Sequence, residues 1–249
     1  MGCQTDMLKT DELRQIVSQA KRLVAFTGAG ISAESGIPTY RGENGVWHKY
    51  DPAKYASISY FFQDPQYYWR FFQEVRYPAL RGAKPNDAHM ALARLEENGL
   101  LRAVITQNID GLHQLAGSRR VLELHGNTRR ISCLDCQKRY TMDEVYGQLE
   151  VQLPPACSAC GGSLRPEVVF FGESLPTAVL EEAVEETRQC DLFVVVGSSL
   201  VVRPAASLPV MAKQQGARLV IVNKEPTPLD PIADVVFHSA ASEVLGAVA

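Results

Sequence analysis

Four cysteines form two Cys-x-x-Cys pairs, Cys133 with Cys136 and Cys157 with Cys160, and twenty residues separate the pairs. This spacing is typical of zinc ribbons, in which each pair places two thiolates on one tetrahedral ion. Four thiolate ligands leave no open position for a catalytic water, so we predict one structural Zn²⁺ in each chain. A redox-active dithiol is the alternative for either pair, and the presence of the other pair argues against it.

A glycine-rich loop follows the first buried apolar run of the sequence. Gly28 to Ala33 read G-x-G-x-x-A, the pattern with which a dinucleotide-binding loop turns from a strand into a helix. Glycines permit close approach of the backbone to a pyrophosphate, and free N–H groups at the start of a helix attract its charge. A tight strand-to-helix turn without a ligand is the alternative.

The loop after this turn is longer than phosphate binding requires. Pro38 cannot lie inside a helix, so the chain has to leave any helix that begins near Ser32. Glu34, Tyr40 and Arg41 are then expected to lie on a loop that folds over a bound cofactor. An ordinary surface loop is the alternative.

Polar residues that follow two further runs are candidates for acid–base chemistry. Gln107, Asn108 and Asp110 follow the run that ends at Thr106, and His125 ends the run "VLELH". A lone histidine is more often structural than catalytic. A general base needs polar groups within reach, however, and here an amide and a carboxylate are close in the sequence. We therefore interpret His125 as a candidate general base.

The elements that must position these residues are predicted from the apolar runs. The runs "RLVAFTG", "LRAVITQNIDG", "CDLFVVVGSSL" and "ARLVIVNKEP" alternate with helical patterns at 87–99, 178–189 and 204–216. Such alternation favours the α/β class, here a Rossmann-like parallel sheet with helices on both faces. Ligands of these sheets bind beyond the carboxyl ends of the strands, where the small hydroxyls of "GSSL" and the Asn of "VNKEP" would suit ribose and phosphate. Plain loop chemistry is the alternative for these last two stretches.

Two segments interrupt this alternation and define the predicted domains. Residues 43–84 are rich in aromatic side chains and are predicted to form a helical insertion. Residues 127–165 carry the cysteine pairs and are predicted to form a small zinc-ribbon module. The discontinuous remainder, 1–42, 85–126 and 166–249, is predicted to be the dinucleotide-binding domain.

Composition and charge exclude several classes of protein. With 249 residues, a net charge of −3 and an isoelectric point near 6.0, the chain gives no electrostatic reason to expect nucleic-acid or membrane binding. No apolar run is long enough to span a bilayer. The segment "MGCQTDMLKT" has no apolar signal core, and we therefore expect a cytoplasmic protein.

These motifs occur together, and in one order, in a known family. The stretches "GAGISAESGIPTYRG", "TQNIDGLH", "LHG", "FFGE", "GSSLVVRPAA" and "VNKEPT", with the cysteine pairs between the third and the fourth, resemble those of sirtuins, which are NAD-dependent protein-lysine deacylases. The resemblance runs from about residue 20 to the C-terminus and is to the compact bacterial and archaeal members. It implies NAD as a co-substrate, Zn²⁺ as a structural ion and acetylated-lysine proteins or peptides as partners.

The resemblance also implies a role for each matching residue. The catalytic residues are His125, as the general base, and Asn108. The residues implied to border NAD are Gly28, Ala29, Gly30, Glu34, Ile37, Tyr40, Arg41, Gln107, Asn108, Ile109, Asp110, Gly197, Ser198, Ser199, Asn223, Lys224, Glu225 and Ala241. The residues implied to flank the substrate peptide are Val168, Phe170, Gly172, Glu173, Leu200, Val201, Val202 and Arg203.

In the implied reaction, the acetyl oxygen of the substrate lysine attacks C1′ of the nicotinamide ribose, and nicotinamide leaves. His125 takes a proton from a ribose hydroxyl, and the acetyl group ends on ADP-ribose. Protein mono-ADP-ribosylation is the nearest alternative, because the same pocket serves if a protein nucleophile reaches C1′. A noncatalytic NAD or ADP-ribose binding module needs no base, and a hydride-transferring dehydrogenase does not explain the long covering loop.

Two positions bear on what the pocket accepts. The family usually has Phe where this chain has Tyr40, which leaves the effect of the added hydroxyl on nicotinamide exchange open. Sirtuins that favour succinyl or malonyl lysine carry a Tyr-x-x-Arg pair, and the matching positions here, Phe72 and Val75, cannot bind a carboxylate. We therefore expect acetyl to be preferred over succinyl. Two exceptions would restore an acidic preference: a shift in register that brings in Tyr67 and Arg70, which also have Tyr-x-x-Arg spacing, or an Arg76 that turns inward.

Overall fold

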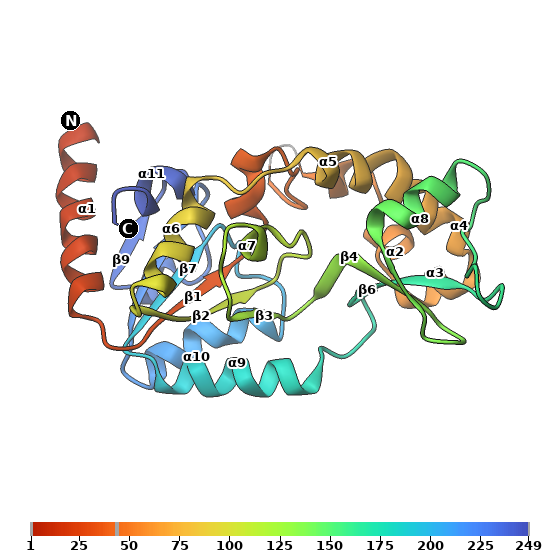
Figure 1. Cartoon of the computed structure of the whole chain (residues 1–249). Helices are drawn as coiled ribbons and strands as arrows, with labels where there is room; N and C mark the ends of the chain where they lie inside the picture. The colour runs from red at the N-terminus through yellow and green to blue at the C-terminus, as the bar shows by residue number, and fades with distance from the viewer. Residues whose placement is uncertain (1, 43–44, 249) are drawn as a thin grey trace.

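The computed structural model describes the backbone of residues 2–42 and 45–248, and the side chains of residues 11–42 and 45–248. Within these ranges, no helix is long and apolar enough to cross a membrane. The predicted α/β fold is confirmed (Figure 1).

A six-stranded sheet forms the larger part of the molecule, and all its neighbouring strands run parallel. Its strands lie in the order β3-β2-β1-β7-β8-β9. Their bounds are β1 Leu23–Thr27, β2 Leu101–Thr106, β3 Val121–Glu123, β7 Leu192–Val196, β8 Arg218–Val222 and β9 Val235–Phe237. The four predicted runs form the central strands. The two edge strands have three residues each, too few for an apolar pattern to indicate them.

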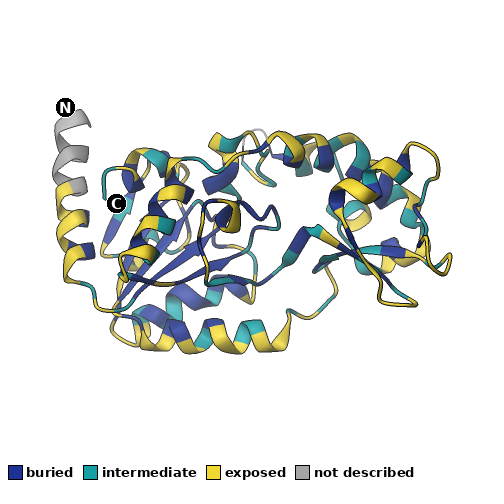
Figure 2. Ribbon diagram, viewed as in Figure 1, coloured by how far each residue is buried: buried dark blue, intermediate teal, exposed yellow. Residues whose placement is uncertain are grey.

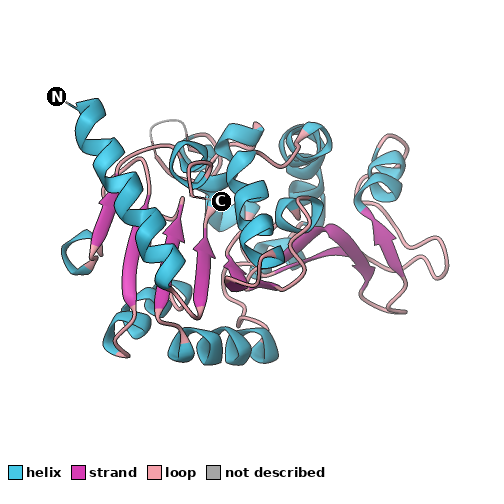
Figure 3. Cartoon of the chain, turned by 60° about the vertical axis from the view of Figure 1, so that its left-hand side comes forward, coloured by secondary structure: helices cyan, strands magenta, loops and turns pink. Residues whose placement is uncertain are grey.

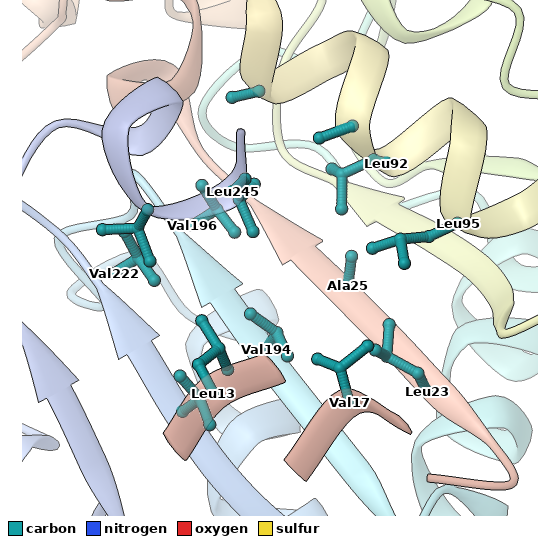
Figure 4. Packing of buried hydrophobic residues seen from close by; sticks show 14 of the residues in the cluster. Leu13, Val17, Leu23, Ala25, Leu92, Leu95, Val194, Val196, Val222 and Leu245 are labelled. Atoms are coloured by element: carbon teal, nitrogen blue, oxygen red, sulfur yellow. The ribbon is translucent and has the colours of Figure 1, made fainter. Parts of the chain in front are cut away.

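Helices cover both faces of this sheet, and each face has its own hydrophobic core. On one face, α1 (Gly2–Gln19), α6 (Asp87–Glu97) and α11 (Ala241–Leu245) bury residues such as Leu13, Leu92 and Leu245 against the strands (Figure 4). On the other face lie α9 (Thr177–Gln189) and α10 (Leu208–Gln214). The strands are buried along most of their length, whereas the helices expose their outer sides (Figure 2).

Helix α6 illustrates how the sequence specifies these elements. Its buried residues include Ala88, Ala91, Leu92 and Leu95, which recur at helical spacing and form one face. Asn86 precedes the helix and accepts hydrogen bonds from the N–H groups of Ala88 and His89, which caps the first turn.

A smaller body is built from the two predicted insertions. The second insertion contributes β5 (Arg139–Thr141) and α8 (Met142–Leu149), and with β4 (Gly126–Cys133) and β6 (Leu164–Val168) it makes an antiparallel sheet of order β5-β4-β6. The first contributes the short helices α2 Pro52–Tyr55, α3 Ile58–Gln63, α4 Pro65–Phe71 and α5 Tyr77–Gly82, and the π-helical turn Phe72–Arg76. Side chains of both pack in one hydrophobic cluster, while the predicted domain boundaries stay a prediction.

The strand order creates a crevice where the chain reverses its direction of progress across the sheet. From β1 the chain goes on to β2 and β3 on one side, whereas β7 leads to β8 and β9 on the other. Figure 3 shows strands of this sheet side by side, with helices around them. In open parallel sheets, ligands bind at the carboxyl ends of the strands beside such a point. Gly28 follows β1 and Gly197 follows β7, so both candidate loops lie at this crevice.

Candidate active site

A cavity of about 600 Å³ opens at the carboxyl ends of the central strands, and a smaller pocket of about 50 Å³ lies beside it. The sequence assigned a set of residues to catalysis, to NAD binding or to the peptide. All but three of these residues line the cavity or the pocket. The residues shared by the cavity and the pocket are Ala29, Tyr40, Arg76, Asn108 and Ile109. The predicted residues are therefore brought together by the fold from distant parts of the chain.

Glu34, Leu200 and Val201 are the three that lie elsewhere. The carboxylate of Glu34 accepts hydrogen bonds from the hydroxyl and N–H of Ser242, at 2.6 and 3.2 Å, so it holds the first turn of α11. Leu200 is buried in the core on the α9 side of the sheet, and Val201 is 51% exposed. Their assignment to NAD or peptide stays a prediction that no contact in the structure supports.

The glycines of the first loop pack against a second loop. A Cβ atom at Gly28 would meet the carbonyl oxygen of Gly197 at 2.8 Å, and one at Gly30 would meet Gly197 Cα at 2.7 Å. Gly197 has φ +64°, and its own Cβ would meet Ile31 N at 2.2 Å. Glycine is therefore required at these positions because the two loops touch each other.

The loop between β1 and the covering segment differs from the prediction in one respect. It forms a 3₁₀-helix, Ala29–Ser35, and ends at Gly36 with φ 83°. The N–H of Gly30 donates to the carbonyl oxygen of Gly197 at 2.8 Å, so this group is not free for phosphate.

His125 lies at the cavity wall, on the turn between β3 and β4. Its Nδ1 is 2.9 Å from the carbonyl oxygen of Gln107. A carbonyl oxygen only accepts, so Nδ1 carries the hydrogen and Nε2 is left with a free lone pair. Burial lowers the pKa of His125, and the hydrogen bond to Gln107 opposes this shift. The ring is therefore neutral at physiological pH, as a general base requires.

The predicted polar residues after β2 are fixed by neighbouring loops. Gln107 Nε2 donates to the Ser198 hydroxyl at 2.7 Å, which joins the loops after β2 and β7. Asn108 Nδ2 donates to the carbonyl oxygen of Gly28 at 3.1 Å and to the Ser32 hydroxyl at 3.2 Å. Both amide hydrogens are thus engaged, so Asn108 offers a ligand its carbonyl oxygen, an acceptor for a hydroxyl.

Ser32 is a site residue that the sequence reasoning missed. It is fully buried, and its hydroxyl donates to Asp110 Oδ2 at 2.8 Å while accepting from Asn108. Burial raises the pKa of Asp110, and hydrogen bonds from Leu112 N–H and Ser32 oppose this rise. The position of Ser32 inside the glycine motif was a usable signal, because this motif directly follows β1 at the predicted site.

Two further histidines lie behind the site. His113 Nε2 is 2.9 Å from the Thr27 hydroxyl, and the rings of His89 and His113 are 4.9 Å apart. Burial lowers the pKa of His89 to about 4 and that of His113 to about 3. Both rings are therefore neutral, and they support the loops from behind the site.

The predicted covering loop extends over the cavity. The ring of Tyr40 stacks on Trp47, with centroids 5.1 Å apart. A Cβ atom at Gly42 would meet Glu225 Oε1 at 2.8 Å, so this loop touches the loop after β8. Trp47 lines the cavity but carried no sequence signal. The other lining residues that were not predicted are Ala33, Thr39, Gly42, Ala56, Arg76, Val169, Phe171, Leu175, Pro204, Val222 and Ser239.

Arg76 reaches the cavity because the helix around it is irregular. Residues Phe72–Arg76 form a π-helical turn, which holds one more residue than an α-helical turn. Val75 and Arg76 both line the small pocket, and Arg76 also lines the large cavity. Arg76 therefore points inward. This is the orientation named from the sequence as an exception to the expected acetyl preference.

The wall predicted for the peptide is held by its own backbone contacts. The Glu173 carboxylate accepts from the N–H of Phe170 at 2.9 Å and pairs with Arg165, which fixes the "FFGE" turn. Phe171 N–H donates to the carbonyl oxygen of Ala56 at 2.7 Å, which joins this turn to the helical insertion.

The lining of the cavity is more basic than the protein as a whole. Its charged side chains are Arg41, Arg76, Arg203 and Lys224 against Glu173 and Glu225. The Glu173 carboxylate is already paired with Arg165. The remaining charge of the lining is therefore positive and suits an anionic ligand such as a diphosphate.

The four predicted cysteines converge at one end of the small sheet, as expected. Their sulfur atoms lie within 4.8 Å of one another, and the pairs Cys133–Cys160 and Cys136–Cys157 are each 3.5 Å apart. Tetrahedral zinc with bonds of about 2.3 Å needs sulfur atoms about 3.8 Å apart, so the set fits Zn²⁺. The Tyr140 hydroxyl lies 3.0 Å from Cys157 Sγ and supports the site from outside.

Sequence comparison relates the chain to known proteins. The model of the Sir2 family matches residues 28–204. NAD-dependent protein deacylase 2 of Archaeoglobus fulgidus is 54% identical over 239 residues, which are 94% of each chain. NAD-dependent protein deacetylase of Thermotoga maritima is 46% identical over 231 residues, which are 93% of each chain.

Solved structures with the same fold contain a peptide together with NAD⁺ or an acetylated ADP-ribose. A Sir2 histidine-to-alanine variant with a deacetylated p53 peptide and 3′-O-acetyl-ADP-ribose has a TM-score of 0.92 and 45% identity, over 96% of each chain. A Sir2 complex with a p53 peptide and NAD⁺ has a TM-score of 0.86 and 44% identity, over 94% of each chain.

Proposed function

The chain belongs to the Sir2 family, and we propose from this premise that it is an NAD-dependent protein-lysine deacetylase. It transfers the acetyl group of acetyl-lysine to ADP-ribose and releases nicotinamide and O-acetyl-ADP-ribose. Its relatives carry the names of NAD-dependent deacylases and deacetylases over nearly their full length. NAD is consumed as a substrate in this reaction.

The hydrogen bond from His125 Nδ1 to the Gln107 carbonyl oxygen is the observation that carries the proposal. It leaves Nε2 free to take a proton, in a cavity lined by both predicted loops. A module that only binds NAD needs no base held in one tautomer. His125 is thus proposed to deprotonate a ribose hydroxyl, which then accepts the acetyl group.

Asn108 and its neighbours are proposed to orient the nicotinamide ribose. Because Gly28 and Ser32 occupy both amide hydrogens of Asn108, its carbonyl oxygen can hold a ribose hydroxyl in a fixed direction. Such positioning lowers the barrier by avoiding loss of rotational freedom during the reaction. Asp110, tied to Ser32 and to the N–H of Leu112, is proposed to contact the carboxamide.

The adenosine half of NAD is proposed to lie along the loops after β7 and β8. Ser199, Asn223, Lys224 and Ala241 line this part of the cavity. Asn223 Nδ2 donates to the carbonyl oxygen of Glu225 at 2.7 Å, which keeps this loop in one shape. The cationic lining around the crevice is proposed to hold the diphosphate.

The acetylated peptide is proposed to lie extended between the "FFGE" turn and residues 200–203. Backbone pairing with two loop edges gives affinity with little sequence preference. Val168, Phe170 and Val202 line the cavity between these edges and suit the apolar stem of the substrate lysine.

Product analysis tests this proposal against its alternatives. The protein is incubated with NAD and a peptide that contains one acetyl-lysine, and all products are identified by mass spectrometry. We expect deacetylated peptide, nicotinamide and O-acetyl-ADP-ribose in equal amounts. ADP-ribose attached to protein would favour the transferase, unchanged NAD would favour a binding module, and an absorbance increase from reduced NAD would favour a dehydrogenase.

A further inference from the structure

Tyr40 and Arg76 lie where the large cavity joins the small pocket. Both residues line both spaces, together with Ala29, Asn108 and Ile109. A small ring that moved between the two spaces would pass these five residues. The position of the Tyr40 ring therefore influences how easily such a molecule passes.

Two contacts hold the Tyr40 ring in its present position. The ring stacks on Trp47 of the same loop, at an interplanar angle of 25°. In addition, its hydroxyl oxygen accepts a hydrogen bond from Arg76 Nη1 at 3.4 Å, and the guanidinium carbon lies 5.8 Å from the ring centre. The second contact uses the hydroxyl, which Phe at this position would lack.

Arg76 is itself fixed by the aromatic residues of the helical insertion. Its guanidinium lies 5.3 Å from the ring centre of Phe71 and 5.9 Å from that of Tyr68, at the end of the π-helical turn. Among the residues that the structure describes, no carboxylate forms an ion pair with it. Within the described part of the chain, the side chain that accepts a hydrogen bond from Arg76 is Tyr40.

Asp110, which is proposed to contact the carboxamide of NAD, lines the small pocket, so nicotinamide released from C1′ has this pocket beside it. We propose that Arg76 is a positioning residue that tethers the Tyr40 hydroxyl and thereby restrains the return of nicotinamide from the small pocket to the reaction centre. The inference rests on the proposed function. A tethered ring keeps the junction narrow after nicotinamide has left C1′. The forward reaction is then favoured over its reversal.

Reversal is measurable as base exchange. The ring nitrogen of free nicotinamide forms a bond to C1′, the bond from C1′ to the acyl oxygen breaks, and NAD and the acetyl-lysine are regenerated. Isotope-labelled nicotinamide therefore appears in NAD at a rate that can be compared with the rate of deacetylation in the same mixture.

Tyr40→Phe is the main test, because it removes one hydroxyl and leaves the ring and its stack on Trp47. We expect the ratio of exchange to deacetylation to rise about threefold or more, a change of the size that one hydrogen bond supports. Arg76→Met should raise the ratio similarly, and the double variant should add nothing, because each change removes the same contact. Arg76→Lys keeps a donor and should fall between.

Tyr50→Phe is a matched control, since Tyr50 packs on Phe71 of the same insertion but lines neither space. Its ratio should equal that of the unchanged protein. A ratio unaltered by Tyr40→Phe, or additive effects in the double variant, would overturn the tether. Absence of acetyl transfer in the unchanged protein would instead refute the proposed function, so the two failures are distinguishable.

Discussion

At the scale of single residues, the chemistry depends on which nitrogen of His125 is free. The carbonyl oxygen of Gln107 fixes the hydrogen on Nδ1. Burial lowers the pKa of the ring and keeps it neutral, although the hydrogen bond to Gln107 works in the opposite direction. A base in this state accepts a proton without first losing one.

The pH dependence of the reaction follows from this lowered pKa. A base works in its unprotonated form, so activity should fall as the pH drops through the pKa of His125. Because burial lowers that pKa, we expect the acid limb of kcat/KM below about pH 6.5, the ordinary value for histidine. Initial rates with an acetyl peptide across the acid range give the midpoint. A midpoint above neutrality would contradict a buried neutral base.

The sequence could predict which residue types the site needs, but it could not predict all the contacts that these residues make. Gly28 and Gly30 were expected to make room for phosphate, whereas a side chain there would strike the loop at Gly197. That contact joins segments far apart in the chain, so no local pattern reveals it. Glu34 similarly binds Ser242, a partner 208 residues away.

At the scale of elements, one extra residue in a helical turn changes the shape of the pocket. Spacing along the sequence placed Phe72 and Val75 at the acyl end. In the structure Phe72 is buried in the core, whereas Arg76 at the end of the π-helical turn joins Val75 in the pocket wall, beside the Tyr40 hydroxyl. A π-helical turn depends on tertiary packing and has no clear sequence signature, which is why the sequence left this orientation open.

An inward Arg76 modifies the expected acyl preference. A guanidinium near the acyl end can form charge-assisted hydrogen bonds with a terminal carboxylate. We expect a succinyl-lysine peptide to react about tenfold faster than its neutral succinamide analogue of equal size, and Arg76→Met to remove this difference. Parallel rates on the two peptides, with the acetyl peptide as reference, are the measurement. Equal rates in the unchanged protein would restore the original expectation of an acetyl preference.

The zinc module and the helical insertion depend on each other. Cys133 and Cys157 belong to the same hydrophobic cluster as Trp69 of α4 and Phe170 of the peptide wall. Sequence spacing predicted that the four cysteines would come together, because such sites are encoded by local Cys-x-x-Cys pairs. It could not predict that two insertions separated by 42 residues, 85–126, share one core.

Loss of the metal should therefore reach the active site. Structural zinc contributes roughly 10–16 kcal/mol in isolated modules, comparable to the whole stability of a domain. We expect Cys133→Ala to lose zinc, loosen the shared cluster and abolish deacetylation, as measured by metal analysis, near-UV circular dichroism and activity.

Cys190→Ala is the control for this change. Cys190 is buried near α9, and its thiol donates to the carbonyl oxygen of Thr187, far from the cysteine cluster. The variant should retain zinc and activity. Full activity of the unchanged protein after complete removal of zinc would contradict the structural role.

At the scale of the whole molecule, two buried histidines link stability to pH. His89 and His113 have pKa values of about 4 and about 3, below the ordinary value of about 6.5 for an unfolded chain. Their contribution to the free energy of unfolding is therefore fully present above the pKa of histidine in the unfolded chain. It is lost as the pH falls below that pKa, because the histidines of the unfolded chain bind protons at a higher pH than those of the folded chain. Asp110 has a raised pKa and opposes part of this loss.

This linkage predicts acid destabilisation. Between pH 7 and pH 5, each buried histidine should remove about 2 kcal/mol from the free energy of unfolding. Urea unfolding at the two pH values measures the difference, and in His113→Gln the pH dependence should be about half as large. A stability that stays constant between these pH values would contradict neutral burial of the pair.

The central claim is that His125 acts as the base after nicotinamide has left. It is tested most directly by one reaction mixture that contains His125→Ala, NAD, an acetyl-lysine peptide and labelled nicotinamide. We predict that O-acetyl-ADP-ribose formation falls by about 10²–10⁴-fold while NAD still binds and labelled nicotinamide still enters NAD. Near-normal formation of O-acetyl-ADP-ribose by this variant would contradict the account, because another group would then be the base.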